Sequence, residues 1–238
     1  MCRLTLLLIP LLVSSSAFAA TVYIVAAADR QARDFDVDGV WSFIDPDTNT
    51  ILRAGYDEAP FQEFRSAMEF DLTSIPTGAV VSAVSVSLFV SQIYSLSTVD
   101  VYGYAGNGII ELSDMEGGTA LASFPTIVGA TEVALSPAFF QNLLSGGSGF
   151  AGLRVQWGAD QERSSVQIRS SEFSLVESRP TLTLEYSAVP EPSVALQFML
   201  GLVGLASQRR ASAYAARRFG STRLRRDLGA VRSVSYPS

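Results

Sequence analysis

The sequence has one segment whose residue types and spacing suggest metal chemistry, the acidic stretch DFDVDGVWSFID at residues 34–45. Its DxDxDG core matches a calcium-binding loop, in which alternate carboxylates converge on a hard cation and a glycine permits the sharp turn. The expected ligands are the side chains of Asp34, Asp36, Asp38 and Asp45, the backbone carbonyl of Val40, and Ser42, directly or through water. Calcium bound there would pin the loop to the domain and stabilise it by mass action. The alternative interpretation is a solvated acidic loop whose like charges repel each other.

The composition excludes several kinds of catalysis. The chain has no histidine and no lysine, and its single cysteine, Cys2, lies in a segment that we expect to be removed. Histidine-activated nucleophiles, Schiff-base lysines and histidine-ligated zinc therefore lack the residues that form them. Paired carboxylates for glycoside hydrolysis remain open, but residues 20–188 contain 21 acidic residues, so a sequence pair such as Asp57 and Glu58 carries no information. We therefore expect a protein that is not an enzyme.

Aromatic side chains offer a second chemistry, because a ring with an apolar face and a polar tip can stack on a sugar. The candidates are Trp41, Tyr94, Tyr102, Tyr104 and Trp157. Trp157 shares the parity of the apolar residues before it, which predicts a core position. Tyr102 and Tyr104 alternate with apolar residues, so we expect them to be exposed and, with Trp41, to be the carbohydrate contacts. The alternative for each ring is ordinary packing in the protein interior.

A framework of short strands must position these residues. Residues 64–72 and 80–91 alternate apolar and polar side chains and face each other across the turn sequence at 75–78, the period-2 pattern of half-buried strands. Further strands are predicted at 22–25, 51–56, 99–104, 131–135, 152–157, 165–169 and 181–186, at a spacing typical of an antiparallel sandwich. One helix is predicted from Ser136 as N-cap and Pro137 at its first position to Gly146, and it is expected to cover one end of the sandwich.

Length and charge describe the domain that these strands build. Residues 20–188 are enough for one domain with a single apolar core. They contain 8 arginines and 21 acidic residues, which gives a formal charge of −13. Such a surface repels nucleic acid and anionic polymers unless cations intervene, so we expect no nucleic-acid partner.

The first 19 residues have the pattern of a secretory signal peptide. Arg3 precedes an apolar run at residues 4–13, and the small-residue pattern AFA occupies residues 17–19. We expect cleavage after Ala19, which also removes Cys2. The exported chain then has no cysteine, so an apolar core or a bound metal must stabilise it without disulfides.

The C-terminal region carries a second targeting pattern. Val189, Pro190, Glu191 and Pro192 precede an apolar segment at 194–206, and Arg209 and Arg210 follow it. This order resembles the PEP-CTERM sorting signal of Gram-negative bacteria. The resemblance implies a membrane helix at 194–206, recognition and processing by exosortase, and export in a bacterium that makes exopolysaccharide. The arginine-rich residues 211–238 are expected to be an unstructured extension, with binding of anionic lipid or nucleic acid as the other interpretation.

Two stretches of the domain carry a further resemblance. The segments MEFDLTSIPTGAVVSAVSVSLFV at 68–90 and RPTLTLEYS at 179–187 are similar to the central and closing strands of DNRLRE-type and related carbohydrate-binding-module-like domains. The resemblance spans about residues 20–188. It implies a secreted jelly-roll sandwich.

Together these patterns predict an all-β jelly-roll sandwich at 20–188 with one short helix, a signal peptide at 1–19 and a C-terminal hydrophobic helix. The expected function is that of an exported, non-enzymatic protein of the cell surface or extracellular matrix. The expected partners are exosortase, exopolysaccharide and, before processing, the inner membrane. Two alternatives stay open: a carbohydrate-active lyase or glycoside hydrolase, and a surface protein that remains tethered to the membrane.

Overall fold

The computed structural model describes residues 19–45, 50–58, 61–95, 98–158 and 165–188, together with residue 201. The expected signal peptide before Ala19 lies outside these residues, as does the extension at 211–238. So do the sorting residues Val189, Pro190, Glu191, Pro192, Arg209 and Arg210 and, apart from Gly201, the expected hydrophobic helix. In the part of the chain that is described, no helix is long and apolar enough to cross a membrane.

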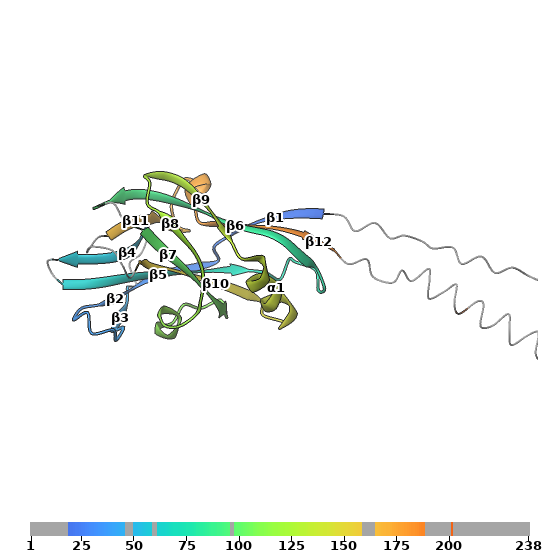
Figure 1. Ribbon diagram of the computed structural model, residues 1–238, viewed down its shortest axis with the longest axis horizontal. Helices are drawn as coiled ribbons and strands as arrows, with labels where there is room; N and C mark the ends of the chain where they lie inside the picture. Colours follow the sequence, from blue (N-terminus) through green and yellow to red (C-terminus); the bar gives the residue numbers. More distant parts are fainter. Residues whose placement is uncertain are drawn as a thin grey trace, which may run out of the picture. The chain divides into compact units, whose positions relative to one another are not determined.

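The described residues between 19 and 188 form mainly β-strands (Figure 1). The strands are β1 (Ala19–Val25), β2 (Ala28–Asp34), β3 (Phe43–Ile44), β4 (Ile51–Glu58), β5 (Phe61–Asp71), β6 (Val80–Ile93), β7 (Thr98–Gly106), β8 (Thr119–Pro125), β9 (Gly129–Leu135), β10 (Phe150–Trp157), β11 (Ser165–Arg169) and β12 (Thr181–Ser187). Within these ranges there is one α-helix, α1 (Pro137–Ser145), with two 3₁₀ turns, η1 (Leu112–Met115) and η2 (Val176–Ser178). The strand pairs are antiparallel. The prediction of a mainly β domain with one short helix is confirmed.

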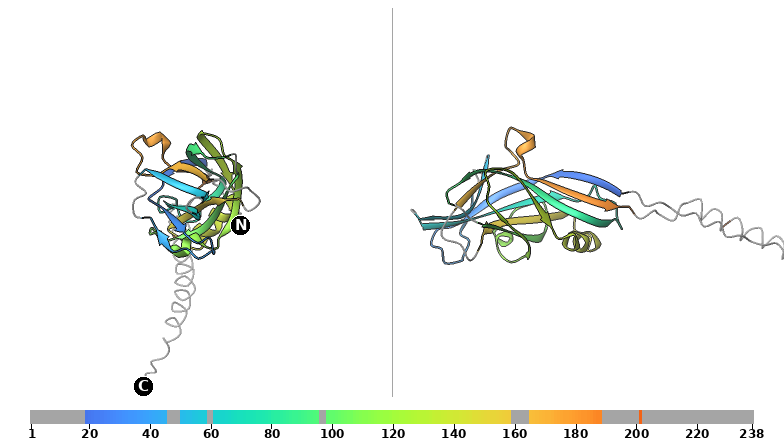
Figure 2. Two further views of the ribbon diagram at one scale, coloured as in Figure 1. Left: turned by 90° about the vertical axis from the view of Figure 1, so that its left-hand side faces the viewer. Right: turned by 45° about the horizontal axis from the view of Figure 1, so that its top comes forward.

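The strands follow two hydrogen-bonded runs that belong to one sheet. One run has the order β3-β2-β5-β10-β7-β8, and the other has the order β1-β12-β6-β9. β11 and β4 join the runs, because β11 pairs with β6 and with β4, and β4 pairs with β5. The sheet therefore curls (Figure 2), so that strands from both runs enclose one apolar core.

The two alternating segments on either side of residues 75–78 lie in different runs. β5 pairs with β2, β4 and β10, whereas β6 pairs with β12, β11 and β9, so no ladder among the described residues joins β5 to β6. Met68 and Phe70 of β5 and Val86 of β6 nevertheless belong to the same apolar cluster. Gly78 has a φ of 80° at the turn between them, a conformation that glycine adopts without steric cost. The turn thus carries the chain from one run to the other.

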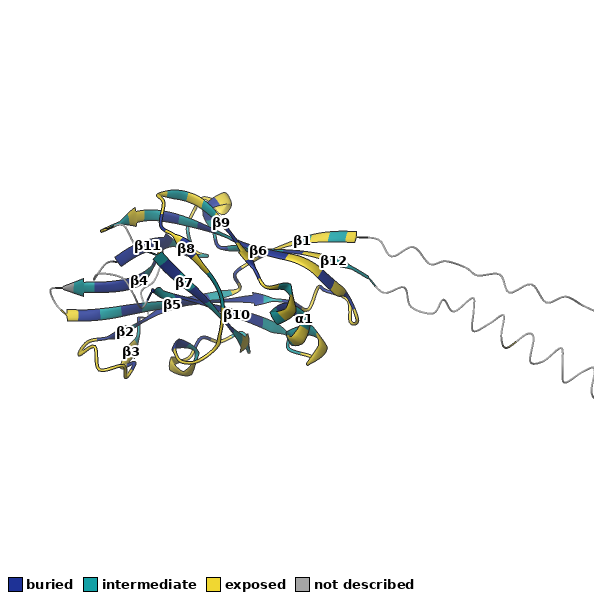
Figure 3. Cartoon of the chain, in the orientation of Figure 1, coloured by how far each residue is buried: buried dark blue, intermediate teal, exposed yellow. Residues whose placement is uncertain are grey.

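Burial follows the alternation that the sequence predicts. In β6 the buried residues are Val81, Val84, Val86, Leu88 and Val90, and Ser85, Ser87 and Ser91 are partly exposed. Burying one such large apolar side chain contributes about 1.5–3 kcal/mol to the free energy of unfolding. Exposed positions are concentrated in the loops and at strand ends (Figure 3). Apolar burial is therefore the main source of stability for this cysteine-free domain.

Helix α1 is anchored at one end of the core. Phe140 is fully buried, and Pro137 occupies the start of the helix as predicted. The side chain of Gln141 accepts a hydrogen bond from the Val81 backbone N–H at 2.9 Å and donates one to the Ala79 carbonyl at 3.2 Å. Ser136 is the N-cap by position, but its side chain makes no capping hydrogen bond; the Phe139 backbone N–H instead donates to the Ser136 carbonyl at 3.3 Å.

Two phenylalanines of β5 provide a matched test of this core. Phe70 is fully buried, whereas Phe61 on the same strand is 59% exposed. We predict that Phe70→Ala lowers the free energy of unfolding by about 3–5 kcal/mol, the cost of a large cavity. Phe61→Ala should lower it by about 0.5 kcal/mol or less. Urea denaturation of both variants measures the difference, and equal losses would contradict the core described above.

Candidate functional site

The acidic loop between β2 and β3 is held by its own first residue. Asp34 is fully buried at the end of β2, and its carboxylate accepts hydrogen bonds from the backbone N–H groups of Asp36 at 3.2 Å and Gly39 at 2.8 Å. Val37 has a φ of 54° within this turn, which is rare for a β-branched residue. The carboxylate of Asp34 therefore stabilises a strained turn by satisfying backbone donors.

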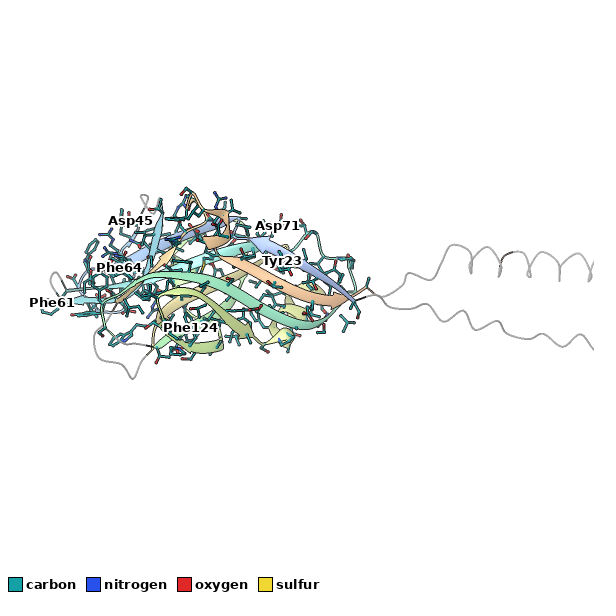
Figure 4. All side chains as sticks on the ribbon, turned by 90° about the horizontal axis from the view of Figure 1, so that it is seen from above. Tyr23, Asp45, Phe61, Phe64, Asp71 and Phe124 are labelled. Atoms are coloured by element: carbon teal, nitrogen blue, oxygen red, sulfur yellow. The ribbon has the colours of Figure 1, made fainter. Side chains whose placement is uncertain are left out.

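The last acidic residue of the loop forms an ion pair with an arginine. The Asp45 carboxylate accepts a hydrogen bond from Gln31 Nε2 at 2.9 Å and forms an ion pair with the Arg33 guanidinium. Arg33 also lies 5.5 Å from the ring centroid of buried Phe64. Asp45 and Phe64 lie toward the same end of the domain (Figure 4). The Asp45 carboxylate thus points toward β2, where the Arg33 guanidinium neutralises its charge.

The six predicted calcium ligands are not brought together in this conformation. Asp36, Asp38, Val40 and Ser42 are exposed, and Asp38 Oδ1 accepts a hydrogen bond from the Val40 backbone N–H at 2.8 Å. Among the described residues, no group of three or more acidic, cysteine or histidine side chains is arranged to hold a metal ion. Calcium in this loop stays a prediction, and it requires Asp45 to exchange Arg33 for the ion.

A second apolar cluster lies on the opposite face of β2 and β5 from the main core. Trp41 of the acidic loop and Ile110 and Met115 of the segment after β7 pack there on Ala32 and Ala67. The Arg65 guanidinium lies 4.5 Å from the Trp41 ring centroid and donates a hydrogen bond to the Met115 carbonyl at 2.8 Å. Two loops therefore cover this face of the sheet. Trp41 is 4% exposed, so its ring is not presented to a sugar.

The two tyrosines of β7 have different surroundings. Tyr104 is half-buried, so its expected exposure is met only in part: its hydroxyl is buried, and its ring covers Gly152, its partner in the β7–β10 ladder. Burial, followed by the negative charges of Glu69 and Asp114, raises the pKa of Tyr104. Tyr102 is half-buried, with the Arg154 guanidinium 4.8 Å from its ring centroid. Of the three predicted carbohydrate contacts, Trp41 is thus buried, and Tyr102 and Tyr104 are each partly accessible.

The remaining two aromatic candidates lie elsewhere. Tyr94 is 54% exposed, and its hydroxyl accepts a hydrogen bond from Gln167 Nε2 at 2.9 Å. Trp157 is half-buried and its indole Nε1 is buried, so its expected core position is met in part. It is the last residue of β10 and pairs there with Val99 of β7.

Buried charges under the two loops were not predicted. Glu69 of β5 is fully buried, and its carboxylate accepts hydrogen bonds from the backbone N–H groups of Gly108 and, at 3.2 Å, Asn107. Burial raises the pKa of Glu69, the Gly108 hydrogen bond opposes this, and the negative charge of Asp114 adds to it. Glu69 therefore fixes the start of the loop after β7.

Arg154 of β10 is a second buried charged residue, and it lies near Asp114 and Tyr102. It is 3% exposed, and burial, with a further contribution from the positive charge of Arg65, lowers its pKa to about 10. Its Nη1 lies 3.5 Å from the Asp114 carbonyl. No local sequence signal marks Glu69 or Arg154, because both occupy outward positions of their strands and are buried only when distant loops close over them. The Arg154 guanidinium therefore packs on the Tyr102 ring within the protein and is not itself presented to a ligand.

The comparisons with known proteins add no relative. No protein-family model matches the chain, and no curated protein matches it in sequence. Function is therefore argued from the residues and their geometry alone.

The Arg33–Asp45 ion pair gives a stability prediction. Asp45→Asn keeps an acceptor for Gln31 but removes the charge that pairs with Arg33, so we predict a loss of about 1–3 kcal/mol in the free energy of unfolding. Asp36→Asn in the same loop is the control, because Asp36 is exposed, and it should change stability by about 0.5 kcal/mol or less. Urea denaturation at neutral pH measures both. Equal stabilities of the two variants would contradict the pair.

The contact between Tyr104 and Gly152 gives a second prediction. A Cβ at position 152 would lie 2.2 Å from the Tyr104 ring, whereas one at Gly149 would meet only Thr73 Cγ2 at 3.8 Å. We predict that Gly152→Ala costs about 1–3 kcal/mol through overpacking and that Gly149→Ala costs about 0.5 kcal/mol or less. In a Tyr104→Ala background the cost of Gly152→Ala should fall by about 1 kcal/mol or more. An unchanged cost in that double-mutant cycle would show that the ring does not cover Gly152.

Proposed function

We propose that this chain is an exported, non-enzymatic jelly-roll protein that acts at the cell surface or in the extracellular matrix, is associated with polysaccharide, and is sorted by exosortase. The observation that carries the proposal is the order of segments in the sequence. A signal-peptide pattern at 1–19 precedes the β domain, and a Pro-Glu-Pro motif, an apolar segment and an arginine pair follow it. The absence of histidine and lysine supports a role other than catalysis.

The pairing of the terminal strands supports this arrangement. β1 and β12 are antiparallel neighbours, and Ala19 pairs with Ser187. The two ends of the domain therefore leave it side by side, at the end opposite the loop between β2 and β3 (Figure 1). The first and last described residues of the domain thus lie at the same end, where the segments expected to carry the two targeting signals join it.

Charge and aromatic residues support an association with polysaccharide. The formal charge of −13 on residues 20–188 disfavours anionic polymers unless a cation bridges them, and leaves neutral glycans as direct partners. The partly exposed side chain of Tyr102 and the exposed side chain of Tyr94 offer aromatic surfaces of the kind that stack on sugars. These residues are on the surface of a rigid sheet, which suits a binding module.

Cell fractionation with two antibodies tests the localisation of the protein and the cleavage of its C-terminal segment. One antibody recognises the β domain and the other recognises the final residues. We predict that the domain epitope is found outside the inner membrane on a shortened chain that lacks the C-terminal epitope. Replacing Pro190, Glu191 and Pro192 with alanine should leave a full-length membrane species, because the processing enzyme then loses its motif.

Asp227→Ala, which lies in the C-terminal extension, is the matched control and should be processed normally. Both epitopes on one full-length membrane species of the unaltered chain would contradict sorting by cleavage and favour a permanent tether. A domain that stays inside intact cells would contradict export itself.

A further inference from the structure

A pair of carboxyl groups lies at the start of β2, away from the acidic loop and from the covered face. Asp29 is fully buried, and Glu172 is an exposed residue in the turn after β11. The Asp29 carboxyl contacts the Glu172 carboxyl, and Asp29 Oδ2 accepts a hydrogen bond from the Ser171 backbone N–H. Asp29 Oδ1 is buried and has no hydrogen-bond partner. An unpaired carboxylate oxygen at a fully buried position is costly and requires an explanation.

The charges around this pair do not neutralise it. Burial raises the pKa of Asp29 to about 7, although the Ser171 N–H opposes this, and the negative charge of Glu172 raises it further. Partial burial opposes ionisation of Glu172, but hydrogen bonds with Asp29, Ser170, Ser171 and the backbone together outweigh it and lower the pKa of Glu172. Arg30 lies 3.7 Å from Glu172, but both side chains are more than 40% exposed, and Arg30 also donates a hydrogen bond to the Asp29 backbone carbonyl. Among the described residues, the ion pair at this site reaches Glu172 only, and no arginine pairs with the buried carboxyl group of Asp29.

The remaining groups around the pair are oxygen-bearing side chains. Ser171 interacts with both carboxyl groups, and the hydroxyl of buried Ser170 accepts a hydrogen bond from the Glu172 backbone N–H at 3.3 Å. Carboxylate, hydroxyl and carbonyl oxygens are the ligands of hard divalent cations, and calcium tolerates the irregular geometry of a turn better than magnesium does. The site thus has two carboxylates and neutral oxygens, fewer acidic groups than the loop at 34–45.

We propose that Asp29 and Glu172 bind one calcium ion, with the unpartnered Asp29 oxygen and the Glu172 carboxylate as its charged ligands. The ion joins the start of β2 to the segment between β11 and β12. Ala27, beside Asp29, donates a hydrogen bond to the Glu69 carbonyl, and Ala26 donates one to the Pro180 carbonyl. The site therefore fastens the corner between β1 and β2 to the segment that leads into the last strand. This inference does not depend on export or sorting.

Thermal melts of the purified full chain in mild detergent, with calcium or with chelator, test the site. We expect calcium at about 100 times its Kd to raise the melting temperature by roughly 5–10 °C. Glu172→Gln should abolish this rise, because it removes a charged ligand at an exposed position where folding does not depend on it. Glu177→Gln is the matched control on the same segment, since Glu177 is also exposed, and it should retain the full rise.

The double variant Asp36→Asn, Asp38→Asn separates this site from the acidic loop and should also retain the rise. A rise that survives Glu172→Gln, or one that disappears with the loop variant, would overturn the assignment. No rise in the unaltered chain would overturn it as well.

The pH dependence distinguishes a bound ion from a shared proton. In chelator, the raised pKa of Asp29 means that the folded state holds a proton that the unfolded state releases, so stability falls as the pH rises from about 4 to about 7. Asp29→Asn should remove this part of the fall. Calcium should remove it in the unaltered chain too, because the ion replaces the proton. If the fall is the same with and without calcium, the pair only shares a proton and the proposal is wrong.

Discussion

The structure depends on the apolar contact between two strand runs that no disulfide bond joins. β6 is central to it, because it pairs with β12, β11 and β9 while its valines and Leu88 face the core. Residues 20–188 have no cysteine and a formal charge of −13, so the energy of burial must exceed both chain entropy and electrostatic repulsion. A continuous curled sheet achieves this, since each run supplies one wall of the same core.

The loops over β2 and β5 are fixed by a different kind of interaction. There the carboxylates of Asp34 and Glu69 accept backbone N–H groups of the loops, and Arg65 donates to the carbonyl of Met115. Such charge-assisted hydrogen bonds are shorter and stronger than neutral ones, and they replace regular strand ladders where the backbone turns. Residues of the sheet therefore fix the positions of the loops that lie over this face, the one that also carries Tyr102 and Arg154.

The periodic features of the sequence predicted the fold well. Predictions of side-chain exposure failed where loops cover the outer face of the sheet. The alternation in 64–72 and 80–91 and the pattern at 136–146 correspond to β5, β6 and α1. Tyr104 alternates correctly with its neighbours, yet a loop from residues 107–116 covers it in part. The same closure buries Trp41 and Glu69. Alternation indicates which face of a strand a residue occupies, but not whether distant residues later cover that face.

The number of carboxylates in a segment is a weaker guide to metal binding than the partners of each oxygen. In the acidic loop, Asp34 has two backbone donors and Asp45 has Gln31 and Arg33, so their charges are compensated by the protein itself. At the start of β2, only two carboxyl groups meet, and one buried oxygen of Asp29 has no donor. A cation lowers the free energy most where the protein leaves such a charge uncompensated. A regular motif such as DxDxDG can therefore form a self-sufficient turn, whereas an irregular pair of residues 143 positions apart in sequence can require an ion.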